Sequence, residues 1–412
     1  MPSVLLAGAF GQRNPGDDAL LDAFVRELPG WRCVATSREP ARTAARHAVA
    51  AVPSRDPRRV AGALRHVDAL VLAGGTVFKT LDAGRHPHAL LRNALALTTA
   101  ARLLGRRVAL LGVGAGRLAD PGARRLARLL VRSADLLVLR DEESAATLAA
   151  IGAPTPFRVG ADAAWPLLGA RSEQPAGARR DGAIVVAVGR HGGEAALAGR
   201  LAEALAGIPA ARWLAGVAGR RRAADAPAEG QRSDAGPAAR GPAPLVRIQP
   251  WQVGDAGEDA AGLDDEGHAH LLATALRRRG LAAEVVPPPA SVLDARDLVA
   301  GARLVIATRF HATVAAAAAG VPFLAVAHEQ KLAGVARRLG QASVAADAPV
   351  PQLAAAVAGA LDRPPAAPAA VAAEVAAARD GFRLLRLLLS GGAADEGDDV
   401  GALPLAPARW AA

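Results

Sequence analysis

Hydrophobic and polar positions follow a repeated order along the chain: a short apolar run, a glycine-containing turn, then a longer run with helical spacing. The first unit has an apolar run from Ser3 to Gly8, a glycine-rich turn, and helical spacing from Ala19 to Leu28. Short aliphatic and β-branched runs are typical of buried parallel strands, and the helical runs between them are typical of crossover helices. The pattern therefore predicts an α/β fold.

The expected strands fall into two groups, separated by a segment of linker composition at 169–181. The expected strands lie near residues 3–8, 31–36, 68–73, 107–112 and 135–139 in the first group, and near 183–188, 245–251, 282–286, 303–307 and 323–327 in the second. We predict an N-terminal Rossmann-like domain over 1–168 and a C-terminal Rossmann-like domain over 182–360, facing each other across a cleft.

Three further segments fall outside the expected pattern of strands. Residues 216–244 are rich in Ala, Gly, Pro and Arg and lack periodicity, so we expect a disordered insertion there. Residues 366–390 predict a terminal amphipathic helix, and residues 391–412 predict a loose tail.

Candidate chemistry is densest between Ala302 and Lys331. An expected strand ends there in Thr-Arg-Phe-His at 308 to 311, and an alanine-rich helical run follows. This edge of an open α/β sheet binds ligands, and a helix amino terminus with Arg309 and His311 suits a phosphate or carboxylate. We expect Lys331 to close the next strand at the same edge. The alternative is that Arg309 caps a neighbouring carbonyl and His311 is an ordinary helix-start residue.

Arg140 is a further candidate anion ligand, because it follows the strand expected at 135–139. Its alternative role is an ion pair with Asp141 or Glu142.

Lysine usage supports Lys331 as a functional residue. Of the 49 Lys and Arg residues only Lys79 and Lys331 are lysine, and tyrosine is absent, which indicates a coding bias. A lysine retained against that bias indicates either a need for a compact ammonium group or retention by chance.

The N-terminal half offers candidates for binding a sugar acceptor. Asn14 and Asp17 lie in the turn after the first strand, where they can cap a helix or bind hydroxyl groups. Gly75, Lys79 and His86 follow the third strand, in an expected acceptor-binding loop whose alternative is a mobile surface loop. The glycine spacing departs from the dinucleotide-binding fingerprint, and the His-Pro-His spacing at 86 to 88 is no established metal pattern. We therefore expect no metal and no cofactor.

Composition narrows the function further. A chain of 412 residues with 51% hydrophobic residues can bury two cores. Its one cysteine, Cys33, excludes a disulfide framework and fits a reducing cytoplasm. The net charge of +10 is compatible with anionic substrates or an acidic membrane surface, and a solvated arginine-rich surface is the alternative that accounts for most of these charges. The 3% of aromatic residues argue against nucleic acid.

No apolar run is long and uninterrupted enough for a transmembrane segment, and the amino terminus lacks a basic leader. We expect a cytoplasmic protein that is soluble or peripheral to the inner face of the membrane. The sequence leaves its oligomeric state open.

Several ordered motifs between residues 3 and 345 resemble those of the polysaccharide pyruvyl transferases. They are Asn-Pro-Gly-Asp-Asp-Ala at 14 to 19, the glycine turns at 74 and 112, Arg-Asp-Glu-Glu-Ser at 140 to 144, Asp-Ala-Ala-Trp at 162 to 165, and Arg309 and His311 with Lys331. Residues 328 to 331 read His-Glu-Gln-Lys where that family usually shows Tyr-Asp-Pro-Lys, and Ala163 stands where it usually shows proline.

The resemblance implies a fold like that of two-domain, GT-B-like glycosyltransferases. It also implies transfer of pyruvate from phosphoenolpyruvate, as a co-substrate, onto two hydroxyls of a sugar in a cell-surface glycan or its precursor. The product would be a cyclic ketal, with release of phosphate. The resemblance assigns phosphoenolpyruvate binding to Arg140, Arg309, His311 and Lys331, and we expect His311 and Arg309 to act in catalysis.

Two other functions remain open at this stage. A nucleotide-sugar glycosyltransferase of the same architecture would use Arg309 and Lys331 for a diphosphate. A non-catalytic glycan- or anion-binding protein could keep the fold without the chemistry. The acceptor sugar could be lipid-linked or nucleotide-linked.

Overall fold

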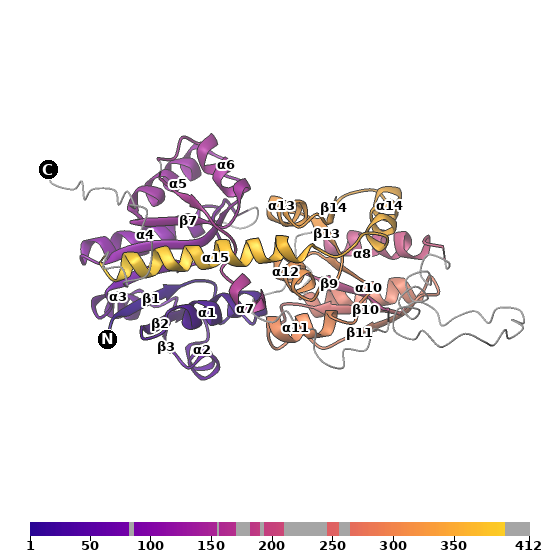
Figure 1. Ribbon diagram of the computed structural model, residues 1–412, viewed down its shortest axis with the longest axis horizontal. Helices are drawn as coiled ribbons and strands as arrows, with labels where there is room; N and C mark the ends of the chain where they lie inside the picture. The colour runs from indigo at the N-terminus through magenta and orange to yellow at the C-terminus, as the bar shows by residue number, and fades with distance from the viewer. Residues whose placement is uncertain are drawn as a thin grey trace, which may run out of the picture. The chain divides into compact units, whose positions relative to one another are not determined.

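A computed structural model describes residues 1–81, 86–154, 156–169, 182–189, 193–209, 245–254 and 264–391. The chain forms two compact units, one made of Met1–Ala170 with Ala372–Ala412 and one of Arg171–Val371. We call them unit 1 and unit 2, and Figure 1 shows their helices and strands. The expected linker, insertion and tail lie outside the described residues, except for Gly169 and Gly391.

Unit 1 contains a parallel sheet in the order β3-β2-β1-β4-β6-β7-β8, with β5 paired to β6. Its strands are β1 (Ser3–Ala7), β2 (Arg32–Ser37), β3 (Ala50–Pro53), β4 (Ala69–Ala73), β5 (Thr76–Phe78), β6 (Arg107–Ala115), β7 (Leu136–Leu139) and β8 (Arg158–Val159). Its helices are α1 (Pro15–Glu27), α2 (Pro40–His47), α3 (Pro57–Arg65), α4 (Ala89–Leu103), α5 (Pro121–Ser133), α6 (Glu142–Ala150) and α7 (Trp165–Gly169).

Unit 2 contains a second parallel sheet, in the order β11-β10-β9-β12-β13-β14. Its strands are β9 (Ile184–Val188), β10 (Leu245–Pro250), β11 (Ala282–Val285), β12 (Leu304–Ala307), β13 (Phe323–Ala327) and β14 (Ala342–Ala345). Its helices are α8 (Glu194–Ala206), α10 (Asp265–Arg277), α11 (Val292–Val299), α12 (Phe310–Ala318), α13 (Gln330–Arg338) and α14 (Val350–Leu361).

Both sheets have the doubly wound order in which the chain moves outward from a central strand in one direction and then in the other. The reversal falls between β1 and β4 in unit 1 and between β9 and β12 in unit 2. Ligands of such sheets bind at the carboxyl ends of the strands on either side of the reversal. The prediction of two Rossmann-like domains is therefore confirmed.

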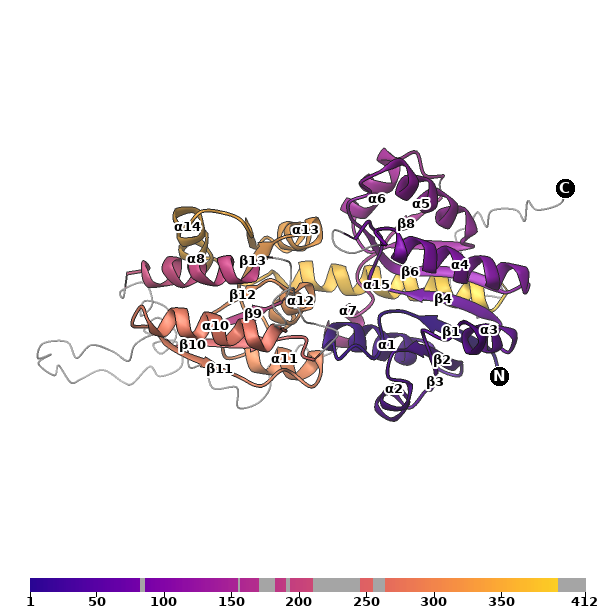
Figure 2. The ribbon, with the colours of Figure 1, turned by 180° about the vertical axis from the view of Figure 1, so that it is seen from behind.

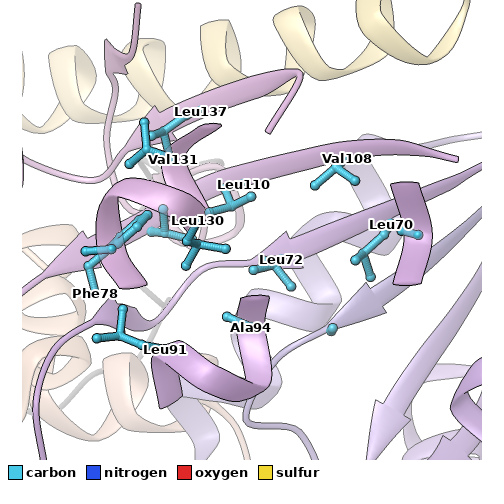
Figure 3. Packing of buried hydrophobic residues seen from close by; sticks show 14 of the residues in the cluster. Leu70, Leu72, Phe78, Leu91, Ala94, Val108, Leu110, Leu130, Val131 and Leu137 are labelled. Atoms are coloured by element: carbon cyan, nitrogen blue, oxygen red, sulfur yellow. The ribbon is translucent and has the colours of Figure 1, made fainter. Parts of the chain in front are cut away.

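The strands are continuous apolar runs because helices cover both faces of each sheet. Every residue of β1, β4 and β12 is buried. On one face of the unit 1 sheet, alternate residues of β4, β6 and β7 pack against α4 and α5 (Figure 3). Leu70, Leu110 and Leu137 are among the strand residues in this core, and Leu91 and Leu130 are among the helix residues. Burial of these side chains is the main stabilising contribution.

The other face of the unit 1 sheet is covered by α1 and by the long terminal helix α15 (Pro368–Leu389). Phe382 of α15 packs edge-on against Phe24 of α1, with ring centroids 4.9 Å apart. At Gly381 the helix comes so close to the sheet that an added Cβ would lie 2.8 Å from Leu111. Figures 1 and 2 view this sheet from opposite sides, with α15 in front in the first and α4 in the second.

One strand boundary differs from the expectation. We expected a strand at 107–112 that ends in a glycine turn, but β6 continues to Ala115. Gly112 has a φ of +67°, and the pairing register with β7 shifts between Leu111 and Val113. The glycine therefore forms a bulge inside the strand, where a left-handed backbone favours glycine over other residues.

A buried histidine joins α2 to α1 in unit 1. The His47 ring is 1% exposed, with Nδ1 2.6 Å from Asp22 Oδ1 and Nε2 3.8 Å from Asp18 Oδ1. Burial alone would lower the pKa of His47. The hydrogen bonds and charges of Asp18 and Asp22 outweigh burial and raise the pKa from 6.5 to about 8.

This pairing predicts that unit 1 loses stability as the pH rises. A histidine whose pKa is higher in the folded than in the unfolded state adds to the free energy of unfolding. This contribution is fully present below the unfolded pKa of 6.5 and is lost as the pH rises past the folded pKa of about 8. We expect the wild type to lose about 2 kcal/mol more than His47→Gln between pH 6 and pH 9. Urea unfolding at both pH values measures this difference. Equal losses in the two proteins would contradict the assignment.

Candidate functional site

The candidate site begins at the carboxyl ends of β9 and β12, where the unit 2 sheet reverses direction. Thr308 follows β12, and its hydroxyl donates toward the carbonyl oxygens of Ala187 and Gly189 at 3.2 and 3.3 Å. These contacts tie the turn after β12 to the end of β9. The next residue, Arg309, is the N-cap of α12. The turn therefore fixes the backbone from which the Arg309 side chain extends.

A buried carboxylate holds the Arg309 guanidinium. Arg309 Nη2 lies 2.9 and 2.7 Å from the two carboxylate oxygens of Asp265, which is fully buried. Asp265 Oδ2 also accepts a 2.7 Å hydrogen bond from the backbone N–H of Gln252. Charge-assisted bonds of this kind fix the orientation of a guanidinium. The recorded partner of Arg309 is thus a carboxylate, rather than the carbonyl considered as the alternative.

Asp265 was not among the residues predicted from the sequence. It is the first residue of α10 and follows Asp264, whose side chain caps that helix by accepting from Glu266 N and Gly267 N. Partial burial acts to raise the pKa of Asp264, but backbone N–H groups, including that of Gly254, donate to the carboxylate and lower it. Two acidic residues at the start of a helix are explained by ordinary helix capping. The sequence therefore does not indicate that one of them is buried and pairs with an arginine.

Gly189 gives the Arg309 side chain its path across the end of β9. A Cβ atom added at Gly189 would overlap the Arg309 side chain at Cγ, Cδ and Nε. The Arg309 side chain is 19% exposed, and its Nε is buried without a hydrogen-bond acceptor among the described residues. The glycine therefore sets where the guanidinium can lie, and Asp265 sets which way it faces.

His311 and Lys331 lie at the starts of two helices at this same edge. His311 is the second residue of α12, half-buried, with its ring 5.4 Å from that of Phe310 at an interplanar angle of 89°. Lys331 is the second residue of α13, and its Nζ lies 2.6 Å from Glu329 Oε2. We expected Lys331 to close a strand, but β13 ends at Ala327 and the chain turns into a helix before the lysine.

The two helices follow strands that pair directly with each other. β12 and β13 are parallel neighbours, so the residues after both strands lie at one edge of the sheet. The sequence prediction that Arg309, His311 and Lys331 share an edge agrees with this arrangement. A fork-shaped cation, a titratable ring and a compact ammonium are suited to a ligand that carries two anionic groups.

An apolar pocket lies beside Arg309 within unit 2. Its walls come from the end of β9 and from α8 and α10, and include Val186, Val188, Leu201 and Leu272. Gly189 and Thr308 also line it. Glu194 and His268 line it as well, so the edge offers cationic groups next to a pocket that is mostly apolar and contains one acidic side chain.

Arg140 lies in unit 1 and is almost fully buried, with 3% of its side chain exposed. Its Nε donates to Asp141 Oδ2 at 3.1 Å, and Nη1 lies 3.8 Å from Asp162 Oδ2. Burial acts to raise the pKa of Asp141. The positive charge of Arg140 and two hydrogen bonds from Ser144 outweigh it and lower the pKa below the usual value. The ion pair with Asp141, one of the two roles left open by the sequence, is therefore present.

The predicted acceptor residues lie around the reversal point of unit 1. Asn14 is the N-cap of α1 and accepts a 3.0 Å hydrogen bond from Gly16 N, and the half-buried Asp17 lies in the first turn of that helix. Gly75 follows β4, which is a direct neighbour of β1. The two turns therefore share one edge of the sheet.

The loop after β4 carries the remaining acceptor candidates. Lys79 follows β5 and is half-buried, and an added Cβ at Gly116 would lie 3.3 Å from Lys79 Cβ. His86 is exposed and lies three residues before α4. Among the described residues, no group of three or more His, Cys, Asp and Glu side chains could hold a metal ion.

The fold is shared with nucleotide-sugar enzymes of the GT-B type. A structure of Anabaena Alr3699/HepE in complex with UDP and glucose has a TM-score of 0.59 and 13% identity, and covers 95% of this chain and 100% of its own. A putative UDP-N-acetylglucosamine 2-epimerase from Listeria monocytogenes has a TM-score of 0.59 and 11% identity, and covers 97% and 100%. These identities show the fold alone. No curated protein matches the sequence.

The family is defined by the sequence itself. The family described as polysaccharide pyruvyl transferase matches residues 14–212 and 246–330, which is well over half of the chain. The chain therefore belongs to the polysaccharide pyruvyl transferase family, which is a family of transferases. The matched residues include Arg140, Arg309 and His311 and end immediately before Lys331.

The pairing of Arg309 with Asp265 predicts a strong energetic coupling. Asp265→Ala leaves the largely buried guanidinium without its carboxylate, so we expect the free energy of unfolding to fall by about 3 kcal/mol. Arg309→Ala should cost a similar amount, and the double variant should cost at least 1 kcal/mol less than the sum. Urea unfolding of the four proteins measures the coupling. Additive losses would show that the two side chains do not stabilise each other.

Proposed function

We propose that the protein transfers pyruvate from phosphoenolpyruvate to two hydroxyls of one sugar, in a cell-surface glycan or its precursor. The products are a cyclic pyruvate ketal and phosphate. The observation that supports this most directly is the Arg309 guanidinium, which Asp265 and Gly189 hold at the reversal edge of unit 2. Membership of the polysaccharide pyruvyl transferase family supports the same reaction.

Phosphoenolpyruvate carries a carboxylate and a phosphate, and the proposed donor site supplies a cation for each. Arg309 presents a fixed guanidinium, which can bind a carboxylate or phosphate through two parallel hydrogen bonds. Lys331 supplies a compact positive charge to the other anionic group. The first backbone N–H groups of α12 also stabilise a nearby anion, because the positive end of the helix dipole lies there. Arg140, which belongs to unit 1, is the third cation in the proposal.

The reaction requires a proton donor near the methylene carbon of phosphoenolpyruvate. That carbon takes a proton, which makes the neighbouring carbon electrophilic, and the first sugar hydroxyl adds there. Phosphate then leaves with its bridging oxygen, and the second hydroxyl closes the ring. One hydroxyl proton balances the new methyl group, and the other leaves with phosphate. We assign the first proton transfer to His311, because an imidazole ring can donate a proton from either ring nitrogen and lies here at the start of α12, beside Arg309.

The proposed acceptor site lies in unit 1, at the edge formed by the turns after β1 and β4. There Asp17, Lys79 and His86 offer groups that bind sugar hydroxyls, and the chain bends at Asn14 and Gly75 to present them. The acceptor can be carried on a lipid or on a nucleotide. The structural neighbour with UDP and glucose supports a nucleotide carrier.

The same neighbour supports a second candidate function, transfer of a sugar from a nucleotide diphosphate donor. In that case Arg309 and Lys331 would bind the diphosphate, and phosphoenolpyruvate would not bind. The two functions therefore differ in which anion stabilises the folded protein.

Thermal shift titration with phosphoenolpyruvate, UDP and inorganic phosphate distinguishes the two functions. A ligand that binds the folded state alone raises the melting temperature. We expect phosphoenolpyruvate to stabilise the wild type more than phosphate does, and this stabilisation to disappear in Arg309→Ala. Stabilisation by UDP but not by phosphoenolpyruvate would instead support the glycosyltransferase.

A matched pair of glycine variants tests the geometry while keeping Arg309 in place. In Gly189→Ala the new methyl group must displace the Arg309 side chain, so we expect stabilisation by phosphoenolpyruvate to be lost. Gly199→Ala is the control, because Gly199 lies within α8 and an added Cβ there meets nothing within 4 Å. Equal responses of the two variants would contradict the proposed path of Arg309.

His311→Ala separates catalysis from binding. If His311 donates the proton, phosphate release from phosphoenolpyruvate with a sugar acceptor should fall by about 10²- to 10⁴-fold. Stabilisation by phosphoenolpyruvate should persist in part, because Arg309 and Lys331 remain. Full turnover in this variant would rule out His311 as the acid. A wild type that binds phosphoenolpyruvate but never releases phosphate would support the non-catalytic alternative.

A further inference from the structure

The three helices α3, α4 and α5 cover one face of the unit 1 sheet and contain no acidic residue. Their nine arginines are Arg58, Arg59, Arg65, Arg92, Arg102, Arg124, Arg125, Arg128 and Arg132. By contrast, α1 on the opposite face carries four acids and one arginine. We call the outer surface of α3, α4 and α5 the arginine face.

Acidic residues that flank these helices neutralise only part of the charge. Asp56, the N-cap of α3, lies 3.8 Å from Arg59, and Asp135 pairs with Arg102 at 2.7 Å. Asp120 pairs with His88 at 2.8 Å, and the hydrogen bond from His88 lowers the pKa of Asp120. α6, which packs on the same face of the sheet, has two glutamates in its first turn. The arginine face keeps a net positive charge after these pairs are counted.

Leucine side chains project into water from the same surface. Of the six large hydrophobic side chains that are exposed among the described residues, three lie on α4 and α5. They are Leu90, Leu103 and Leu129, with exposures of 36%, 83% and 38%. A single exposed leucine needs no explanation, but three exposed leucines on two adjacent helices that carry six arginines combine apolar and cationic groups on one surface.

The leucines and arginines lie on helices that are held side by side. Thr98 of α4 and Ser133 of α5 share a 2.9 Å hydrogen bond, and Arg102 Nε donates to the Ser133 carbonyl oxygen at 2.9 Å. The last turns of the two helices are therefore adjacent, which brings Leu103 near the end of α5. Figure 2 shows α4 and α5 neighbouring each other on the viewer's side of the sheet.

We propose that the arginine face docks onto an anionic lipid surface, with Leu103 and Leu129 entering the interface between headgroups and acyl chains. Exposed arginines beside exposed leucines match the two components of such a surface, negative headgroups and apolar chains. A second copy of this chain that docked through the same positive face would be repelled. α3, α4 and α5 have no aromatic residue, so they lack the stacking groups that single-stranded nucleic acid uses.

Membrane docking does not depend on phosphoenolpyruvate as the donor, but it affects which carrier the acceptor sugar is expected to have. Lys79 and His86, which we propose for the acceptor, lie in the segment that leads into α4. A docked α4 would hold that segment beside the lipid surface. Within the proposed function, which this step rests on, docking favours a lipid carrier for the acceptor over the nucleotide carrier that the structural neighbour supports.

Co-sedimentation of the full chain with vesicles tests the docking. We expect the protein to bind phosphatidylcholine vesicles that contain phosphatidylglycerol, not to bind phosphatidylcholine alone, and to dissociate as salt is added. In Arg125→Gln with Arg132→Gln, binding should weaken about 25-fold, since each arginine near an anionic surface contributes about fivefold. Leu103→Ser should weaken binding without any change in charge.

The matched control removes two exposed arginines from other helices. Arg278→Gln with Arg379→Gln, at the C-cap of α10 and within α15, lowers the net charge equally and should bind within about twofold of the wild type. Both arginine variants should keep the stabilisation by phosphoenolpyruvate, so a failure of docking is distinct from a failure of the proposed reaction. Circular dichroism checks that each variant is folded.

Four results would overturn the docking proposal. They are absence of binding to the anionic vesicles, equal weakening in the control variant, preferential binding of single-stranded DNA by the arginine face, and vesicle binding that appears only after residues 392–412 are removed. The last result would identify the acidic stretch at 395–399 of the same chain as the occupant of the face.

Discussion

A buried carboxylate that faces the carboxyl edge of a parallel sheet is the interaction on which the candidate site depends. Asp265 has no exposed surface, and a charge in that position requires a cation and N–H donors close by. Arg309 and the Gln252 backbone meet that requirement. The arginine is therefore held in place before any ligand arrives, and less conformational entropy is lost when a ligand binds.

The same interaction limits what the site can bind. Because Asp265 balances the charge of Arg309, a bound anion would be held by directed hydrogen bonds more than by net positive charge. Lys331 is also paired, with Glu329 at 2.6 Å. Because each cation at this edge is already paired with a carboxylate, the edge has little net positive charge and does not attract every anion. It favours a rigid ligand whose two anionic groups match the positions of Arg309 and Lys331.

The fold and much of the site could be predicted from the sequence because their signals are local. Apolar runs fixed the position of most strands, and strand ends placed Arg309 and His311 at a sheet edge. Gly112 was misread because a glycine inside a strand and a glycine after a strand have the same local pattern, and pairing with β7 decides between them. Lys331 was misplaced because β13 ends four residues before it. Asp265 was missed because its partner is distant in sequence, and helix capping explains the residue equally well.

The terminal helix makes unit 1 discontinuous in the chain, whereas unit 2 is a single continuous segment. The face of the unit 1 sheet that carries Leu111 and Val138 is covered only once the helix with Gly381 and Phe382 has been synthesised. During translation, unit 2 can therefore fold before unit 1 is complete. Until α15 has been synthesised, the face of the unit 1 sheet that it covers stays exposed. A chain that has been synthesised only to residue 371 would contain all of unit 2, whereas its unit 1 sheet would lack the cover that Gly381 and Phe382 provide.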